Sequence, residues 1–339
     1  MANAVQTTSF SALSVLLLLC GSTLTAQEAP CQKRVLPVSF RDAENLPMQN
    51  VSVGDLEARV HGKPVKIISL ASDTRPHRLV LILDTSGSMG SFDGESALWN
   101  LELSLGRHFY AMNSQKSQIA LLLFNNQVTD TVSFDRGNPA VGDKLQEAST
   151  DRNFVKNYVK GKTALRDAIL QGIKLISSPS SADAVLALTD GGDNASHESM
   201  KDLEERLAVT SVRLFAILLY REGYRNRTPE EVSGPDELSE VARKSGGEIL
   251  TAAEWRGDHV ALSANAGGKV KSEETLNRLY QAILQDNLLE IELPFASRKN
   301  VHWELKLSHA AHRKWRNAQI IYPDTLISCD AEVAGTGRN

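Results

Sequence analysis

A short run of oxygen-bearing side chains follows a strongly apolar stretch in the first third of the chain. Residues 79–83 are all aliphatic, and Asp84, Ser86 and Ser88 follow them at alternate positions, with a glycine between the two serines. A continuous apolar run is typical of a buried strand in a parallel sheet, and ligands of such sheets bind beyond the carboxyl ends of the strands. Carboxylate and hydroxyl oxygens favour Mg²⁺ or Mn²⁺ over zinc or copper. We therefore expect a divalent-cation site at this edge of the sheet.

Three separate stretches resemble the motifs of one known family. Residues 84–88 (Asp-Thr-Ser-Gly-Ser) resemble the D-x-S-x-S signature of von Willebrand factor type A domains, whose metal-ion-dependent adhesion site is completed by a distant threonine and a distant aspartate. Residues 161–168 look like the threonine loop of the family, and residues 186–194 look like its aspartate loop. The three motifs occur in the family's order, and the resemblance extends over residues 76–287. The β segment at residues 34–70 resembles the one that precedes the type A domain in exported bacterial proteins of the "VWFA-related" kind.

The resemblance implies a role for each residue of the metal site. Ser86 and Ser88 would ligate the cation directly, Thr163 directly or through water, and Asp84 and Asp190 mainly through water. Because few carboxylates bind directly, the cation stays short of negative charge and takes an acidic side chain from a partner as a further ligand. We expect a cation-dependent protein-binding module for adhesion or assembly, and not an enzyme. The alternative is a structural or assembly module with a vestigial metal site, in which the flanking β segments make the contacts.

The same residues fit two enzyme classes poorly. In a haloacid-dehalogenase phosphatase Asp84 would be the nucleophile, but Ser86 stands where the general acid is required. Residues 161–163 (Gly-Lys-Thr) look like the end of a phosphate-binding P-loop, but Lys156 occupies the position of its first glycine. Neither a G-x-S-x-G nor an H-E-x-x-H motif is present. Each candidate ligand alone could instead cap a helix or form a turn, and only the three motifs together favour a metal site.

Composition and charge narrow the class of partner. The chain has 339 residues, with 37 basic and 41 acidic side chains and a net charge of -4. A balance of this kind argues against a general attraction to nucleic acid or to anionic membranes. We expect a protein partner that presents an Asp or Glu carboxylate, and no nucleic acid.

The amino-terminal residues indicate export. Residues 10–19 are almost wholly apolar and small residues follow up to Ala26, as in a secretory signal peptide, although no Lys or Arg precedes the apolar run. The run is too short to span a bilayer. A lipoprotein signal at Cys20 fits less well, because Leu19 precedes that cysteine. We expect residues 1–26 to be cleaved and the mature chain to be secreted or periplasmic, without a stable membrane span.

Two cysteines remain after removal of the expected signal peptide. Cys31 and Cys329 lie near opposite ends of the mature chain. In an exported protein they are candidates for a disulfide bond. Free thiols and a bond between chains are the alternatives, and geometry decides among them.

The alternation of apolar strands and amphipathic helices predicts an α/β fold. We expect a doubly wound, mostly parallel, Rossmann-like sheet flanked by helices, together with a small β extension in which the two flanks pair. The expected organisation is a signal peptide at 1–26, an N-terminal β segment at 27–75, the von Willebrand type A domain at 76–287 with an insertion loop at 253–271, a C-terminal β extension at 288–325 and a tail at 326–339.

Helices and strands are expected at defined positions within this organisation. Expected helices are 95–112, 165–176, 198–209, 237–244 and 272–285; expected strands are 34–40, 56–60, 65–70, 79–83, 118–124, 127–134, 184–188, 212–220, 248–250, 288–293, 301–307 and 318–322. Residues 221–234 are expected to be a loop. Residues 309–315 are expected to be an exposed turn, in which His309 and His312 are solvated side chains. The tripeptide Arg256-Gly257-Asp258 lies in the insertion loop and is interpreted as a chance occurrence.

Overall fold

The computed structural model describes most of the chain after residue 31. The described residues are 32–43, 47–48, 50–73, 77–90, 98–180, 183–220, 229–253, 261–264, 272–284, 287–295 and 300–327. The expected signal peptide, both cysteines of the candidate disulfide and Arg256-Gly257-Asp258 lie outside these ranges. These expectations therefore stay predictions. No helix within the described ranges is both long and apolar enough to cross a membrane.

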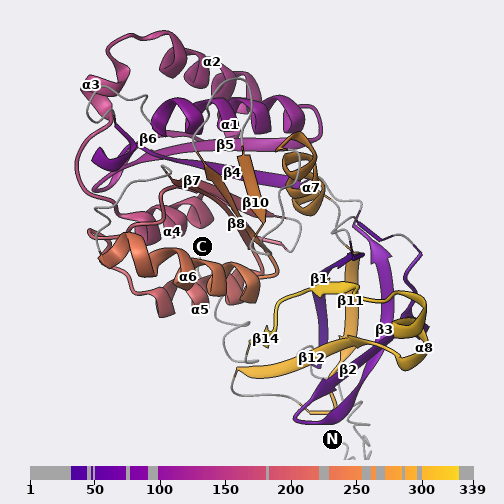
Figure 1. Ribbon diagram of the computed structural model, residues 1–339. Helices are drawn as coiled ribbons and strands as arrows, with labels where there is room; N and C mark the ends of the chain where they lie inside the picture. Colours follow the sequence, from indigo (N-terminus) through magenta and orange to yellow (C-terminus); the bar gives the residue numbers. More distant parts are fainter. Residues whose placement is uncertain are drawn as a thin grey trace, which may run out of the picture. The chain divides into compact units, whose positions relative to one another are not determined.

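A mixed seven-stranded sheet occupies the middle of the chain, with the strand order β10-β9-β8-β7-β4-β5-β6 (Figure 1). Its strands are β4 (His77–Asp84), β5 (Ser117–Phe124), β6 (Val128–Val132), β7 (Ala184–Thr189), β8 (Arg213–Tyr220), β9 (Ile249–Ala253) and β10 (Ala261–Ala264). The five inner strands are parallel, and β6 and β10 are antiparallel edges. The expected α/β class and the expected hairpin of β5 and β6 are both observed.

Helices cover both faces of this sheet. They are α1 (Leu98–Asn113), α2 (Gly137–Thr150), α3 (Phe154–Tyr158), α4 (Leu165–Leu175), α5 (Met200–Thr210), α6 (Pro229–Lys244) and α7 (Ser272–Leu284), with short 3₁₀ turns at Gly87–Met89 and Phe134–Arg136. Leu79, Leu81 and Leu83 of β4 pack with α1, α2 and α7, whereas Val80 and Ile82 pack with α4, α5 and α6. Because both faces of β4 are buried, its sequence is apolar at every position.

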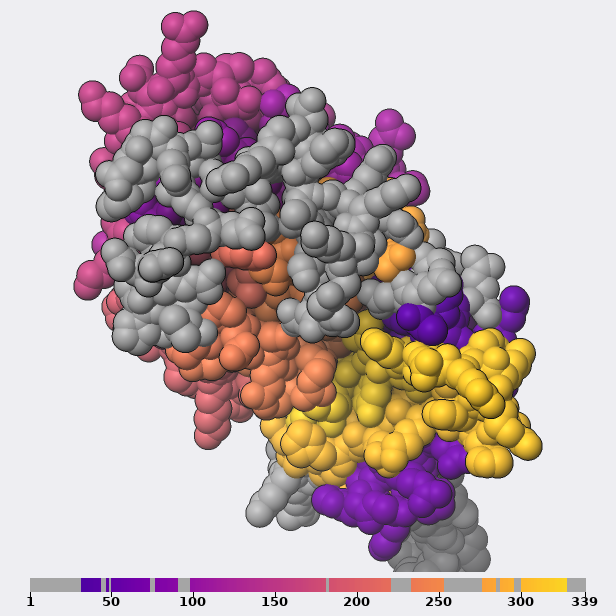
Figure 2. All heavy atoms as spheres, viewed as in Figure 1, coloured from indigo at the N-terminus to yellow at the C-terminus, as the bar shows by residue number. Residues whose placement is uncertain are grey.

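The two flanks of the chain pair in a second, antiparallel sheet with the order β13-β1-β11-β3-β2-β12-β14. Its strands are β1 (Lys33–Arg41), β2 (Leu56–Val60), β3 (Lys63–Ser72), β11 (Asn287–Glu292), β12 (Val301–Leu307), β13 (Gln319–Ile321) and β14 (Thr325–Leu326). Strand β11 lies between β1 and β3, and β12 pairs with β2, so the expected pairing of the flanks is confirmed. In Figure 2 the indigo and yellow surfaces of the flanks adjoin. Residues Cys31–Asn339 form one compact unit, and the boundaries at 75/76 and 287/288 stay predictions.

Three expectations about local structure need correction. Helix α6 begins at Pro229, inside the segment expected to be a loop, and continues through Pro235. The expected insertion loop contains β10, which pairs with β9. Residues His309–Lys314 form a helix, α8, in place of the expected turn, because the Ser308 hydroxyl accepts a hydrogen bond from the Ala311 N–H at 3.3 Å and caps it.

Candidate metal centre

The carboxyl end of β4 places one carboxylate and two hydroxyls side by side. Asp84 is fully buried. Its Oδ1 accepts a hydrogen bond from the Ser86 N–H at 2.8 Å, and its Oδ2 accepts one from the Thr189 hydroxyl at 2.6 Å. The Oγ atoms of Ser86 and Ser88 lie 3.0 Å apart. The first predicted motif is therefore a preformed cluster of oxygen atoms, with its carboxylate fixed from two sides.

Backbone hydrogen bonds join this loop to the segment that precedes α4. The Lys160 N–H donates to the Thr85 carbonyl at 2.8 Å, and the Gly87 N–H donates to the Gly161 carbonyl at 3.0 Å. These bonds hold residues 160–161 against the serine loop, two residues before Thr163. The first and second predicted motifs thus lie at the same edge of the sheet.

The loop that follows β7 holds Thr163 on its other side. The Asn194 side-chain oxygen accepts a hydrogen bond from the Thr163 N–H at 2.9 Å, and the N–H groups of Asn194 and Ala195 both donate to the Thr163 carbonyl at 3.0 Å. Thr163 is 5% exposed. Its backbone is therefore fixed by the third predicted motif, and Asn194 is the residue that makes this connection.

Asp190 supplies the second carboxylate of the site. It follows Thr189, is partly buried, and its Oδ1 accepts a hydrogen bond from the Gly192 N–H at 3.1 Å. Burial, together with the negative charge of Asp190, raises the pKa of Asp84 to about 7. The sequence predicted five ligands; Asp84, Ser86 and Ser88 are in direct contact, and Thr163 and Asp190 are joined to them through the hydrogen bonds of their neighbours.

Sequence reasoning missed a third carboxyl group behind the site. Glu102 of α1 is fully buried, and its Oε1 accepts a hydrogen bond from the Asp84 N–H at 2.5 Å. Its Oε2 is buried without a hydrogen-bond partner among the described residues. Burial raises the pKa of Glu102, and the charge of Asp84 raises it further. Helical spacing could have indicated it, because Glu102 shares the apolar face of α1 with Leu98, Leu105 and Phe109.

Helix α6 also supports the site, from a segment that the sequence did not predict to be helical. Gly191, next to Asp190, has a positive φ of 84°. Pro235 packs beside Gly191, and a Cβ atom added to Gly234 would lie 2.1 Å from the Gly191 carbonyl oxygen. Only glycine at position 234 allows α6 to approach the aspartate loop this closely.

The donor set fits a hard divalent cation. Among the described residues no three His, Cys, Asp or Glu side chains form a metal-binding group. A cation at this edge would therefore depend on serine and threonine hydroxyls together with Asp84 and Asp190. Oxygen donors of this kind suit Mg²⁺ or Mn²⁺, and the concentrated negative charge around Asp84 would be offset by a cation.

Gly161 is the backbone position on which the threonine loop depends most. Its φ is +93°, and an added Cβ would lie 2.2 Å from the Asn126 side-chain oxygen, which accepts a hydrogen bond from the Lys162 N–H. We expect Gly161→Ala to displace residues 161–163 and lower the affinity for Mg²⁺ by about tenfold, from roughly 1–3 kcal/mol of strain. Isothermal titration calorimetry measures this change.

Gly62→Ala is the matched control for this prediction. Gly62 has a φ of +75°, and no atom lies within 4 Å of an added Cβ. The control carries a similar backbone penalty outside the mixed sheet, so its Mg²⁺ affinity should equal that of wild type. Equal affinities for Gly161→Ala and Gly62→Ala would show that the threonine loop does not contribute to a metal site.

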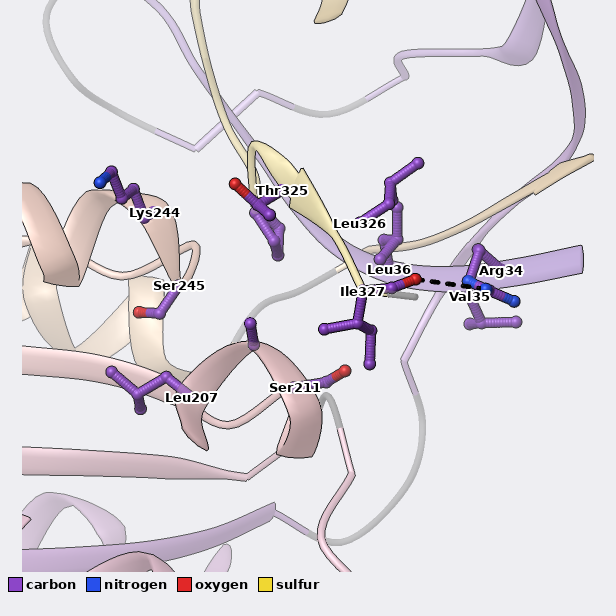
Figure 3. Close-up of a pocket in the computed structure, with 12 residues that line it drawn as sticks. Arg34, Val35, Leu36, Leu207, Ser211, Lys244, Ser245, Thr325, Leu326 and Ile327 are labelled. Carbon is purple, nitrogen blue, oxygen red and sulfur yellow. Dashed lines mark hydrogen bonds between the residues drawn. The ribbon is translucent and has the colours of Figure 1, made fainter. Parts of the chain in front are cut away.

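A pocket elsewhere in the chain offers little room for a substrate. It measures about 60 Å³ and is lined by Arg34, Leu207, Lys244, Ile327 and others (Figure 3). A guanidinium N–H of Arg34 donates to the Ile327 carbonyl at 3.4 Å across part of it. A volume of this size accommodates a few water molecules.

Comparison with known proteins gives one family match, over about a third of the chain. Residues 79–192 match the family model described as von Willebrand factor type A domain. This range contains all five predicted ligands. The match supports a protein with a von Willebrand factor type A domain and agrees with the observed α/β fold. A search of the curated proteins found no match.

Several solved structures are similar to part of the chain. BatB, a conserved hypothetical protein from Bacteroides thetaiotaomicron, is 13% identical, with 61% of this chain and 96% of that chain covered and a TM-score of 0.42. An aerotolerance-related membrane protein from Bacteroides fragilis is 14% identical, with coverages of 61% and 98% and a TM-score of 0.37. Proximal thread matrix protein 1 from the mussel byssus is 15% identical, with coverages of 64% and 49% and a TM-score of 0.43. All three TM-scores are below 0.5, so these structures carry no argument about this chain.

Proposed function

We propose that this chain is a divalent-cation-dependent protein-binding module, in which Mg²⁺ or Mn²⁺ at the carboxyl edge of the mixed sheet accepts an acidic side chain of a protein partner. One observation carries the proposal: three segments far apart in sequence are joined by hydrogen bonds around Asp84 and two serine hydroxyls that lie 3.0 Å apart. Domains of the matched family commonly mediate protein interactions. The proposed role is adhesion or assembly, without a catalytic step.

The resemblance to the family's metal site implies the roles of the individual residues. The hydroxyls of Ser86, Ser88 and Thr163 would hold the cation, and Asp84 and Asp190 would balance its charge, mainly through water. A bound cation supplies a coordination position that a partner carboxylate fills. Asp84 accepts hydrogen bonds at both oxygens, from the Ser86 N–H and the Thr189 hydroxyl, so its carboxylate is held in place without the cation. The apolar residues 10–19 support export, and we place the module in the periplasm or outside the cell.

Calorimetry and a pair of matched peptides test this function. The full chain is titrated with Mg²⁺ and Mn²⁺, and then with a Gly-Ser peptide carrying one glutamate, or with the same peptide carrying glutamine, at up to millimolar concentrations. We expect the glutamate peptide to bind only when the cation is present, and the glutamine peptide not to bind. EDTA should abolish binding of the glutamate peptide.

Two outcomes would contradict the proposal. If the chain takes up neither cation, the metal site is vestigial, and the alternative of a structural or assembly module with contacts through the antiparallel sheet gains support. If the glutamate peptide binds equally well in EDTA, the carboxylate is recognised by other groups of the chain.

A further inference from the structure

A strongly cationic segment leads into the threonine loop. Residues 152–162 contain Arg152, Lys156, Lys160 and Lys162 and no Asp or Glu, although the whole chain has a net charge of -4. All four of these side chains are exposed. We call these four residues the cationic strip. Its charge is therefore opposite in sign to that of the chain as a whole.

None of the four side chains of the cationic strip makes an ion pair with any residue that the structure describes. Two other lysines of the mixed-sheet part are each paired twice: Lys144 contacts Asp130 and Glu147, and Lys244 contacts Glu204 and Glu240. The strip is set apart from single lysines that are also unpaired among the described residues, such as Lys174 and Lys201, because four cations lie within eleven residues that include no Asp or Glu.

The carboxyl-terminal end of the cationic strip is held beside the candidate metal centre, and aromatic packing anchors its middle. The buried ring of Phe154 stacks on Trp99 at 5.2 Å between centroids and contacts the Tyr158 ring at 4.8 Å, which anchors α3. The Lys160 N–H is hydrogen-bonded to the Thr85 carbonyl, one residue from Ser86. In Figure 1 the chain passes from α3 to α4 along the edge at which β4 ends. Lys160 and Lys162, on either side of Gly161, therefore border the loops of the candidate metal centre.

Tyr158 adds an apolar contact to the strip. It is half exposed, at 50%, and is one of two large hydrophobic side chains exposed to this degree in the described part of the chain. A surface that alternates cations with an aromatic ring, next to a site that takes a carboxylate, is suited to a peptide with several acidic side chains. Arginine and tyrosine are also favoured at protein interfaces.

We infer that the partner is an acidic peptide segment with several carboxylates, one of which fills the metal site while its neighbours lie over the cationic strip. This inference rests on the proposed function and names the class of partner for that site. Charges at the rim of an interface act mainly on the association rate and on its salt dependence. Because the screening length is about 8 Å at physiological ionic strength, charges beside the site still contribute there.

Two peptides of equal length test the inference. One is a Gly-Ser peptide with a single glutamate, and the other has glutamate at every second position; binding to the full chain is measured in Mn²⁺ by fluorescence anisotropy at increasing NaCl. We expect the multi-glutamate peptide to bind more tightly, by about two- to fivefold for each strip residue engaged. We expect this preference to fall as NaCl rises. Lys156→Gln/Lys160→Gln/Lys162→Gln should remove most of the preference without weakening Mn²⁺ binding in calorimetry, because loss of nearby positive charge does not disfavour a cation.

A triple substitution outside the strip is the matched control. Lys63→Gln/Lys66→Gln/Lys306→Gln removes the same charge from exposed positions of the antiparallel sheet and should keep the preference. The inference is overturned if wild type shows no preference, if the strip variant keeps it, or if both variants lose it equally. It is also overturned if a sulfated polysaccharide binds the strip more tightly than the multi-glutamate peptide does in EDTA. The proposed function fails separately, if the single-glutamate peptide binds without the cation.

Discussion

Asp84→Asn is expected to lower the affinity for Mg²⁺ and Mn²⁺ by about 10- to 100-fold, the usual cost of losing a group that orients or balances a bound metal. The metal-free variant should be at least as stable as the metal-free wild type. The two effects have opposite signs because Asp84 is fully buried beside Asp190 and Glu102. Asparagine has the same shape without the charge, and its side-chain oxygen can still accept the Ser86 N–H. Calorimetry gives the metal affinity, and thermal unfolding in EDTA gives the stability.

The stability difference should depend on pH in a defined direction. The pKa of Asp84 is raised from 3.8 to about 7 in the folded chain. Between these two values the folded state keeps a proton that the unfolded state releases, so the contribution of Asp84 to the free energy of unfolding falls as the pH rises through this window. In EDTA, the melting temperature of Asp84→Asn should therefore exceed that of wild type by more at pH 8 than at pH 5. A difference that shrinks over this range would contradict the argument.

Asp183→Asn is the matched control. Asp183 is also a buried aspartate, but its Oδ2 lies 2.7 Å from a guanidinium nitrogen of Arg78, at the opposite edge of the sheet. Removing the Asp183 charge leaves the Arg78 guanidinium without its carboxylate partner. This variant should therefore lose stability and keep its metal affinity. If Asp84→Asn loses stability in EDTA as Asp183→Asn does, the Asp84 charge stabilises the metal-free protein. The prediction that this buried charge is destabilising without a cation would then be wrong. If the Mg²⁺ affinity of Asp84→Asn equals that of wild type, Asp84 does not belong to a metal site and the proposed site is wrong.

The central strands and the loops of the site could be predicted because their signals are local. Strand β4 is buried on both faces, which produces an unbroken apolar run. The residues that follow each such strand must lie at the same edge of the sheet, so three motifs in sequence were sufficient to predict one site. The pairing of the two flanks could be anticipated from their strand patterns, but the register of β11 between β1 and β3 follows from tertiary contacts alone.

Helices α2 and α3 lacked a sufficient local signal. The buried apolar positions of α2 are only Val141, Leu145 and Ala148, and the helix includes Pro139 near its start. Helix α3 has five residues and depends on the packing of Phe154 between two other aromatic rings. Tertiary packing therefore stabilises both helices, and intrinsic propensity contributes little.

Two further details of the structure could be recognised only from tertiary packing, for different reasons. Pro235 lies inside α6, where a sequence rule ends the helix because proline lacks an N–H donor. Glu102 interrupts the apolar face of α1, and its contact with the Asp84 N–H can be recognised only once α1 is placed against β4. Both residues border the candidate metal centre, where local rules are most often broken for functional reasons.

Arg213→Met should lower the free energy of unfolding by about 2–5 kcal/mol, because two buried carbonyl oxygens lose their charged hydrogen-bond donor at about 1–3 kcal/mol each. Arg213 begins β8 and is fully buried. Its two terminal nitrogens donate to the carbonyls of Ala282 and Ile283 at 2.8 Å each, in the last turn of α7, where helix carbonyls lack partners within the helix. The guanidinium also lies 5.3 Å from the ring centroid of Phe215. Urea unfolding measures the loss.

The loss should be specific to the junction of α7 with β8. Arg213→Lys keeps the charge but has one nitrogen for two carbonyls, so its loss should be smaller, and Arg206→Met at an exposed position of α5 should stay within about 0.5 kcal/mol of wild type. Hydrogen exchange should rise at residues 276–284 in Arg213→Met. Since Arg213 lies at the amino end of its strand and the candidate metal centre at the carboxyl ends, the folded variant should bind Mg²⁺ with wild-type affinity. A stable Arg213→Met would mean that the cost of burying the guanidinium equals the gain from its two hydrogen bonds, and α7 would then be held by its apolar face alone.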